Sequence, residues 1–205
     1  MSEYNIVDIF YSLKGEGRYT GCPMAFVRLA ECNLNCSFCD TDYTSDARIM
    51  TPAEIIKEIN RFPETDRVVI TGGEPLMQDV FDLVNDLRST GHFVHLETNG
   101  TLPPQVSFDW VAVSPKCEVD KLNGTLMSIA DEVKFLVGFD GWREYIDDVL
   151  DMFPYLRNDS VTRYIMPIAD GQLPNVVNVK MAIDYALKHP DFWYCIQEHK
   201  VLGIK

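Results

Sequence analysis

The feature that most constrains this chain is a run of three cysteines, Cys32, Cys36 and Cys39, with three and then two residues between successive sulfurs. Three thiolates on one short loop can ligate three irons of a cubane [4Fe–4S] cluster. The fourth iron, which no nearby cysteine caps, then stays open to a small ligand. The spacing therefore predicts a cluster that does chemistry rather than one that only holds the fold together.

Zinc and disulfide bonds are the alternative uses of these cysteines. A structural zinc site needs four ligands, usually in two pairs, and the sequence contains no second Cys or His pair. We find no signal peptide, and 205 residues can bury a core without disulfides. We therefore expect reduced, metal-bearing thiols in a cytoplasmic protein. We expect Cys22, Cys117 and Cys195 to be small buried hydrophobic residues.

Composition indicates a soluble enzyme with a single domain over residues 1–205. Hydrophobic residues make up 46% and charged residues 24%, which is ordinary globular usage. No apolar run approaches the roughly 20 residues that a membrane helix needs. Eighteen basic against 31 acidic residues leave a net charge of −13, which repels phosphate backbones. We expect neither a membrane nor a nucleic acid as a partner.

Strand-like and helix-like segments alternate along the chain. Strands are predicted over 25–29, 67–71, 93–98, 110–113, 133–137 and 163–166, with 192–196 as a further candidate. Helices are predicted from a capping box at 51–54 onward, and over 80–87, 142–153 and 176–188. This alternation implies parallel strands with right-handed crossovers. About six strands, in a chain shorter than the ~250 residues of an eight-unit barrel, predict an abbreviated, open α/β barrel of the TIM type.

The unusual motifs all follow predicted strands. The cysteine loop follows the first barrel strand, and 71–75 (Thr-Gly-Gly-Glu-Pro), 97–100 (Glu-Thr-Asn-Gly) and 114–116 (Ser-Pro-Lys) follow or end the next three. Ligands of such folds gather at the carboxyl ends of the strands. Adjacent glycines let the backbone approach a ligand closely. We therefore expect the four segments to form one site.

These residues carry a resemblance to a known superfamily. The Cys-x-x-x-Cys-x-x-Cys run with Phe38 before its last cysteine, followed by Gly72-Gly73-Glu74-Pro75, resembles the radical S-adenosylmethionine (radical SAM) superfamily. The resemblance implies that the open iron chelates the methionine moiety of S-adenosylmethionine (SAM), whose amino group meets the Gly-Gly-Glu segment. It also implies that an electron from the cluster cleaves SAM to a 5′-deoxyadenosyl radical, which abstracts a hydrogen from the substrate.

Further motifs resemble one family within it. The segments 9–17, 39–41, 96–100, 114–116 and 197–200 together are similar to the 7-carboxy-7-deazaguanine synthases, end to end. The resemblance implies a carbon–nitrogen lyase that contracts 6-carboxy-5,6,7,8-tetrahydropterin to 7-carboxy-7-deazaguanine with loss of ammonia, for queuosine and related 7-deazapurines. It further implies Mg²⁺, regeneration of SAM after each turnover, an electron donor such as flavodoxin or ferredoxin, and a homodimer.

The resemblance also implies roles for individual residues. The cluster ligands are Cys32, Cys36 and Cys39, and the Mg²⁺ ligand is Thr41. The residues at SAM are Phe38, Cys39, Asp40, Gly73, Glu97, Ser114, Pro115 and Lys116, with Glu97 near either SAM or the substrate. The residues at the substrate are Leu13, Lys14, Gly15, Glu16, Arg28 and Thr71. Many relatives carry glutamine where this chain has Lys14, so we expect the contact there from backbone groups.

Some of these residues also have plainer explanations. A guanidinium such as that of Arg28 suits a bidentate contact with the substrate carboxylate, but a strand-end salt bridge is the alternative. For Thr41 the alternative is an ordinary loop hydroxyl. The segment 166–170 is expected over the adenosine of SAM. His199 and Lys200 either close the site near the substrate or belong to an exposed tail.

Two other functions remain open at the level of sequence. One is a glycyl-radical activase, a small radical SAM enzyme that acts on a protein. The other is a non-enzymatic zinc or iron–sulfur module. The Leu-Lys-Gly-Glu-Gly run at 13–17 favours the synthase over both.

Overall fold

The computed structural model of the chain describes residues 2–44 and 46–205. In this part of the chain, nine strands form one sheet in the order β11-β8-β7-β6-β5-β4-β2-β1-β3. Its parallel strands are β2 (Pro23–Leu29), β4 (Arg67–Gly72), β5 (Phe93–Thr98), β6 (Trp110–Val113), β7 (Glu132–Val137), β8 (Thr162–Pro167) and β11 (Phe192–Tyr194). The remaining two, β1 (Tyr4–Leu13) and β3 (Arg48–Met50), extend it in antiparallel fashion.

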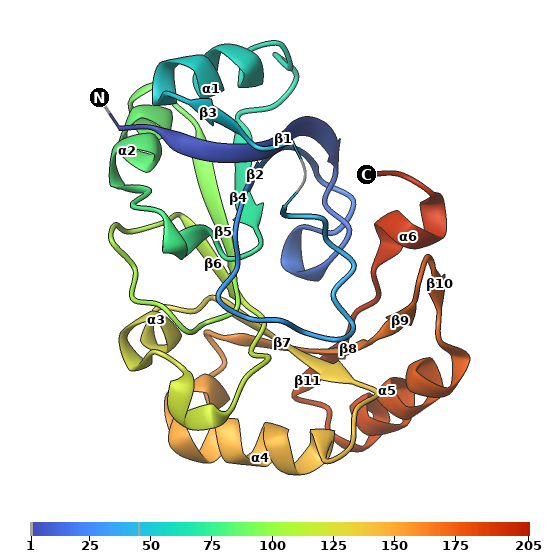
Figure 1. Cartoon of the computed structure of the whole chain (residues 1–205). Coiled ribbons are helices and arrows are strands. Elements are labelled where there is room, and N and C mark those ends of the chain that lie inside the picture. The colour runs from blue at the N-terminus through green and yellow to red at the C-terminus, as the bar shows by residue number, and fades with distance from the viewer. Residues whose placement is uncertain (1, 45) are drawn as a thin grey trace.

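The sheet is open, because its edge strands β3 and β11 lie at opposite ends of the strand order. Figure 1 shows the sheet running through the molecule with helices around its outside. The predicted abbreviated, open α/β barrel is therefore confirmed. The candidate strand near the end of the sequence is present as β11, and among the described residues it makes a seventh parallel strand.

Five helices of the described chain lie between strands: α1 (Pro52–Ile59), α2 (Phe81–Ser89), α3 (Gly124–Ser128), α4 (Trp142–Met152) and α5 (Val176–Lys188). A further helix, α6 (Glu198–Leu202), follows β11. The predicted capping box opens α1: Thr51 N donates to Glu54 Oε2 at 2.8 Å, and Glu54 N donates to Thr51 Oγ1 at 3.4 Å. None of the helices in the described segments has the length and apolar character needed to cross a bilayer.

Short elements complete the structure. Single 3-10 turns lie at η1 (Gly17–Tyr19), η2 (Pro75–Met77), η3 (Val119–Lys121) and η4 (Pro154–Arg157). A separate two-stranded ribbon is formed by β9 (Ala169–Asp170) and β10 (Leu173–Pro174). It lies beside α6 in Figure 1.

The pleat of the parallel strands divides their side chains between two faces. All six residues of β7 are buried, although one is a lysine and one a glutamate. Val133 and Phe135 join the main hydrophobic core, which also contains the buried residues of the helices. The intervening Lys134, with Leu136, faces the opposite, concave side of the sheet. Polar residues on that side are thus held within a protein interior.

The first strand was not predicted from the sequence. β1 pairs with β2 from Ile6 to Leu13, but the register shifts between Ile6 and Asp8. This irregularity breaks the alternation of buried and exposed residues that a strand prediction depends on. The consequence for the site is large, because β1 runs antiparallel to β2 and ends beside Pro23, and residues 13–16 at that end line the concave side of the sheet.

Candidate active site

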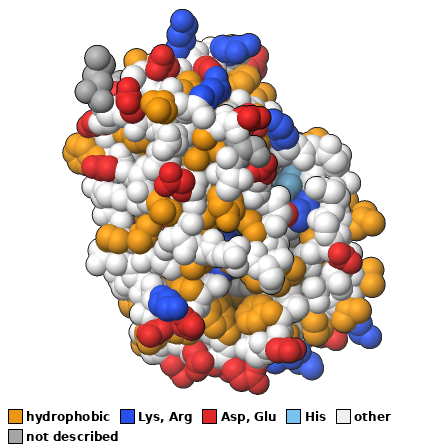
Figure 2. Space-filling model, viewed as in Figure 1, with side chains coloured by type: hydrophobic (Ala, Val, Ile, Leu, Met, Phe, Trp, Pro, Cys, Tyr) orange, Lys and Arg blue, Asp and Glu red, His pale blue; other side chains and the backbone are white. Residues whose placement is uncertain are grey.

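A cavity of about 260 Å³ opens at the carboxyl ends of the parallel strands. Figure 2 shows the hollow near the middle of this face, with basic side chains inside it. All the residues predicted from the sequence to bind cluster, SAM, Mg²⁺ or substrate line this cavity, except Pro115. Pro115 is buried and does not line it. The structure therefore brings the predicted segments together at one place.

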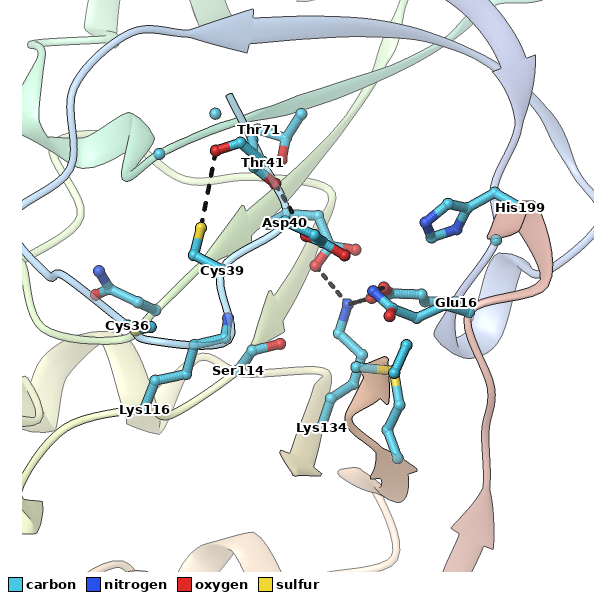
Figure 3. Close-up of a pocket in the computed structure, with 18 of the residues that line it drawn as sticks. Glu16, Cys36, Cys39, Asp40, Thr41, Thr71, Ser114, Lys116, Lys134 and His199 are labelled. Carbon is cyan, nitrogen blue, oxygen red and sulfur yellow. Dashed lines mark hydrogen bonds and ion pairs between the residues drawn. The ribbon is translucent and has the colours of Figure 1, made fainter. Parts of the chain in front are cut away.

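The cavity has two sides. In Figure 3, Cys36, Cys39 and Lys116 lie on one side, and Glu16, Lys134 and His199 lie on the other. Thr41, Asp40 and Thr71 lie between them in this view. The two groups of residues come from distant parts of the chain, so only the folded structure sets them opposite one another.

The cysteine loop rests directly on the turn after β4. Glu74 N donates to Glu31 O at 2.8 Å, and Glu31 itself has a positive φ of 73°. A Cβ added at Gly73 would lie 2.1 Å from Glu31 O and 2.7 Å from Cys32 Cβ. A side chain at this position would thus displace the start of the loop, which is why a glycine is needed there.

A chain of amide and hydroxyl groups holds the cysteine loop to the end of β5. Asn99 Nδ2 donates to Asn33 Oδ1 at 3.0 Å, and Asn33 Nδ2 donates to Thr101 Oγ1 at 2.8 Å. Thr101 Oγ1 in turn donates to Asn99 Oδ1 at 2.7 Å. The Glu-Thr-Asn-Gly motif therefore also has a structural task, which is to fix the loop between Cys32 and Cys36.

Glu74 does not line the cavity. It is fully buried, and its carboxylate accepts hydrogen bonds from Thr98 Oγ1 at 2.7 Å, from Asn99 N at 2.7 Å and from Leu76 N at 3.2 Å. Burial raises the pKa of this carboxyl group. Within the Gly-Gly-Glu motif, the glycines line the cavity, while the glutamate ties the turn after β4 to the end of β5.

The donor set on the cysteine side fits a cluster with one open iron. Cys32, Cys36 and Cys39 line the cavity, and none of the other cysteines in the described ranges does. Burial raises the pKa of the Cys36 thiol, and the nearby Lys116 ammonium group partly offsets this. Three thiolates without a fourth leave room for another ligand.

The expectation for the other cysteines holds only in part. Cys195 is buried, and Gly17 N donates to its Sγ at 3.2 Å. Burial raises the pKa of the Cys195 thiol to about 11. Cys22 and Cys117 are only half-buried, so the prediction that they are fully buried is wrong for these two.

On the opposite side of the cavity, two lysines and two glutamates form a buried ionic network. Lys134 Nζ lies 2.8 Å from Glu16 Oε2 and 2.6 Å from Glu97 Oε2. Lys14 Nζ lies 2.7 Å from Glu97 Oε1. The two positive and two negative charges balance, which is what allows them to be buried together.

The network sets the ionisation of its carboxylates. Burial raises the pKa of Glu16, but the ammonium groups of Lys134 and Lys14 outweigh burial and lower it to about 2. The pKa of Glu97 is also well below its usual value, for the same balance of causes. Because the folded pKa of Glu16 is depressed, its contribution to stability is present above about pH 4.5 and is lost as the pH falls toward 2.

Three side chains, one of which belongs to the ionic network, offer atoms that could ligate a metal. His95, Glu97 and Glu132 offer ligand atoms within 4.8 Å of one another. Both oxygens of Glu97, however, already lie within 2.7 Å of the ammonium groups of Lys14 and Lys134. A cation there would face two positive neighbours, so electrostatics disfavours a metal at this place. Burial lowers the pKa of His95 to about 4, which leaves it neutral.

Arg28 lies in the cavity without a carboxylate partner. Its guanidinium group is 5.7 Å from the ring of Phe10, which stacks on Phe26 with 4.9 Å between ring centroids. Among the described residues, Arg28 makes no salt bridge within 4.0 Å, so the alternative of a strand-end ion pair is wrong. Burial lowers the pKa of this guanidinium group. A half-buried, unpaired guanidinium is suited to an anionic ligand.

The end of the described chain packs against the 13–17 segment. Glu198 N donates to Gly15 O at 2.9 Å, and Gln197 Nε2 donates to Glu16 Oε1 at 2.8 Å. The imidazole of His199 lies over Gly15, where an added Cβ would be 2.1 Å from its Nδ1. These residues therefore lie at the cavity and do not form a free tail.

Two ion pairs add to the contacts that hold the C-terminal segment at the cavity. Lys200 pairs with Asp40, which joins α6 to the cysteine loop. Lys205 Nζ lies 2.5 Å from Asp8 Oδ2, and Ser12 Oγ donates to Lys205 O at 2.6 Å. Segment 196–205 thus bridges β1 and the cysteine loop across one side of the cavity.

Other cavity residues were not predicted from the sequence. Lys134, Leu136 and Gln197 line the cavity, as do Phe10, Phe26 and Tyr43. The signal for Lys134 was present, because it is the one charged residue within the strand predicted over 133–137. Of the segment expected over the adenosine, Met166 to Ala169 line the cavity, and Asp170 does not.

The chain is similar in sequence and in fold to known proteins. The family model described as the radical SAM superfamily matches residues 28–171. The chain is 38% identical over 200 residues to a 7-carboxy-7-deazaguanine synthase of Bacteroides thetaiotaomicron, covering 98% of each protein. It is 35% identical over 211 residues to a synthase of the same name from Neisseria meningitidis, covering 99% of this chain and 95% of the relative. The crystal structure of QueE from Escherichia coli superposes with a TM-score of 0.81 at 25% identity, covering 95% of this chain and 94% of that one.

The close contact at Gly73 yields a testable prediction. We expect Gly73→Ala to lower the free energy of unfolding by about 1–3 kcal/mol and to reduce iron and sulfide content after reconstitution, because its methyl group displaces the loop before Cys32. Gly124→Ala is the matched control, since its Cβ would meet only Phe153 Cε1, at 4.0 Å. Chemical denaturation and iron analysis measure both effects. Full iron content in Gly73→Ala would contradict the prediction.

Proposed function

The chain belongs to the radical SAM superfamily and, within it, to the 7-carboxy-7-deazaguanine synthases, and from this membership we propose how its residues carry out the reaction. It is a radical SAM lyase that converts 6-carboxy-5,6,7,8-tetrahydropterin into 7-carboxy-7-deazaguanine with loss of ammonia, in the biosynthesis of queuosine and related 7-deazapurines. Because the similarity to these synthases extends over the full length of the chain, we no longer consider the glycyl-radical activase or the non-enzymatic metal module as its function.

The cysteine side of the cavity is proposed to hold the cluster and SAM. Cys32, Cys36 and Cys39 would ligate three irons, and the lining residues Ser114 and Lys116 would contact SAM. When bound, cluster and SAM supply a radical that removes a hydrogen atom from the substrate. The backbone of Gly72 and Gly73 also lines this side, which supports a close contact with a ligand.

The ionic side is proposed to hold the substrate. The unpaired guanidinium of Arg28 would bind the substrate carboxylate through two parallel hydrogen bonds. Glu16 and Glu97, ionised at neutral pH, would accept hydrogen bonds from the amino and ring N–H groups of the pterin. The contacts of His199 and Lys200 with the 13–17 segment and with Asp40 would shield the reacting atoms from water.

We also propose a Mg²⁺ site at Thr41. Thr41 lines the cavity next to Asp40, and in the view of Figure 3 it lies between the two sides of the cavity. Its hydroxyl oxygen would join the substrate carboxylate and water around Mg²⁺, which prefers oxygen ligands and retains several waters. The position of Thr41 between cysteine side and substrate side supports this role.

The proposed function rests on one observation above all, which is that predicted cluster and substrate residues line the same cavity. We expect the anaerobically reconstituted protein to convert the tetrahydropterin to the deazapurine and ammonia in the presence of SAM, Mg²⁺ and a reductant. Chromatography with mass spectrometry detects the product. Cys36→Ala, which removes one cluster ligand, should form none. A fully reconstituted wild-type protein without product would contradict the proposed function.

The proposed magnesium ligand can be tested separately from the cluster. In Thr41→Ala, we expect the Mg²⁺ concentration for half-maximal rate to rise about tenfold, the equivalent of roughly 1.4 kcal/mol, because one oxygen ligand is lost. The absorption spectrum of the cluster should not change. Thr41→Ser is the matched control, since it restores the hydroxyl group. An unchanged Mg²⁺ dependence in Thr41→Ala would rule out this role.

The electron donor, the cellular location and the absence of a nucleic acid partner are also proposals. Reduction of the cluster needs a one-electron donor such as flavodoxin or ferredoxin, and the exposure of Cys39 supports access to it. All six cysteines are free thiols in the structure, which supports a cytoplasmic location. The net charge of −13 supports the expectation that nucleic acid is no partner.

We also propose that the protein forms a homodimer. Exposed apolar side chains are frequent on α5 and on the elements after it, for example Ile183, Leu187 and Trp193, and this supports contact with a second copy. We expect light scattering to give about twice the chain mass of 23.4 kDa. Leu187→Glu should shift the protein toward the monomer, whereas Met152→Glu, an exposed apolar position on α4, should not. A wild-type monomer would contradict the homodimer.

A further inference from the structure

Lys134 lies at the centre of the ionic network, and nothing in its sequence motif assigns it a role. Its side chain is only 1% exposed, and it is among the largest fully buried side chains of the described residues. It extends from the middle of β7 to the concave face of the sheet, where it lines the cavity. A buried ammonium group is costly without close anionic partners, so its partners indicate what it is for.

Those partners come from two distant elements. Glu16 belongs to the segment after β1, and its Oε2 lies 2.8 Å from Lys134 Nζ. Glu97 belongs to β5, and its Oε2 lies 2.6 Å from the same nitrogen. One ammonium group thus ties the 13–17 segment to the sheet and sets the spacing between the two carboxylates. Figure 3 shows Lys134 extending toward Glu16 on the side of the cavity away from the cysteines.

The second oxygen of each carboxylate is held as well. Lys14 Nζ lies 2.7 Å from Glu97 Oε1, and Gln197 Nε2 donates to Glu16 Oε1 at 2.8 Å. Each carboxylate oxygen has two lone pairs, so an oxygen that accepts one hydrogen bond can accept another from a ligand. The carboxylates are therefore fixed in orientation but retain capacity for hydrogen-bond donors in the cavity.

Without Lys134, the two buried carboxylates would share the single ammonium group of Lys14, and one negative charge of the pair would be unbalanced. Such a pair ionises with difficulty, and one of the two groups retains its proton to higher pH. Lys134 is the largest single influence that lowers the pKa of Glu16 and of Glu97 against the effect of burial. The other titratable groups that face the two carboxylates are Lys14, His95, Glu132, Cys195 and His199.

We propose that Lys134 is a positioning residue that holds Glu16 and Glu97 ionised and oriented as a pair of acceptors for the N–H donors of the substrate. The inference rests on the proposed function, because the pterin supplies those donors through its 2-amino group and its ring nitrogens. Lys134 acts through the two carboxylates and contacts no reacting atom. Its effect is on substrate affinity and on how that affinity depends on pH.

The test is equilibrium binding of the tetrahydropterin, without turnover. Calorimetry on cluster-loaded protein with SAM, Mg²⁺ and no reductant gives the Kd from about pH 5.5 to about pH 8.5. In wild type we expect no loss of affinity toward low pH from these carboxylates, because both stay ionised. In Lys134→Met we expect binding about tenfold weaker near pH 6, recovering as the pH rises and the carboxylates lose their protons.

Two variants separate positioning from simple structural support. Lys134→Arg keeps the positive charge and should restore the flat pH profile. Lys121→Met removes an exposed lysine that pairs with Glu118 at the surface, and it should leave the Kd unchanged at every pH. A merely structural ion pair predicts no change in the pH profile of binding for folded Lys134→Met. That result would overturn the inference.

A second comparison keeps the test decisive if Lys134→Met does not fold. Glu16→Gln alone should retain a flat profile, because Lys134 still holds Glu97 ionised. Glu16→Gln combined with Lys134→Met buries less unpaired charge and should show affinity that falls toward low pH. Identical profiles for these two variants would overturn the role of Lys134. Failure of wild type to bind the pterin at any pH would instead overturn the proposed function on which the inference rests.

Discussion

The pleat of the parallel strands is the constraint on which the rest of the site depends. Alternate residues of each strand face the helices or the concave side of the sheet, and a polar residue on the concave side reaches the cavity. In β2, Val27 joins the main core while Arg28 lines the cavity, and in β7, Phe135 and Lys134 are divided in the same way. Charged groups are therefore tolerated inside this fold, provided that they find partners there.

Two contacts then hold the cysteine loop at the cavity. The turn at Gly72 and Gly73 approaches the backbone of Glu31 so closely that no side chain fits between them. On the other side, Lys200 pairs with Asp40 and joins α6 to the same cysteine loop. The cysteine loop is thus held from both sides, by the sheet and by the C-terminal segment.

Charge is distributed unevenly between the two sides of the cavity. The cysteine side contains Lys116 beside the thiols, while the opposite side contains the balanced network around Lys134. Arg28, which also lines the cavity, is a guanidinium without a carboxylate partner within 4.0 Å among the described residues. This arrangement suits a ligand with a carboxylate at one end and N–H donors at the other, as the tetrahydropterin has.

The sequence by itself determined the local features: the spacing of the three cysteines, the glycine pair after β4, the capping box of α1 and the alternation of strands and helices. Each depends on residues within a few positions of one another, so no knowledge of the fold was needed. The tertiary structure alone decided the ionic network and the closure by Gln197 and His199. Lys134 and Glu16 are 118 positions apart, and Gln197 and Glu16 are 181 apart. Contacts of that range exist only once the sheet has formed, because they join segments that no local pattern of the sequence relates to one another.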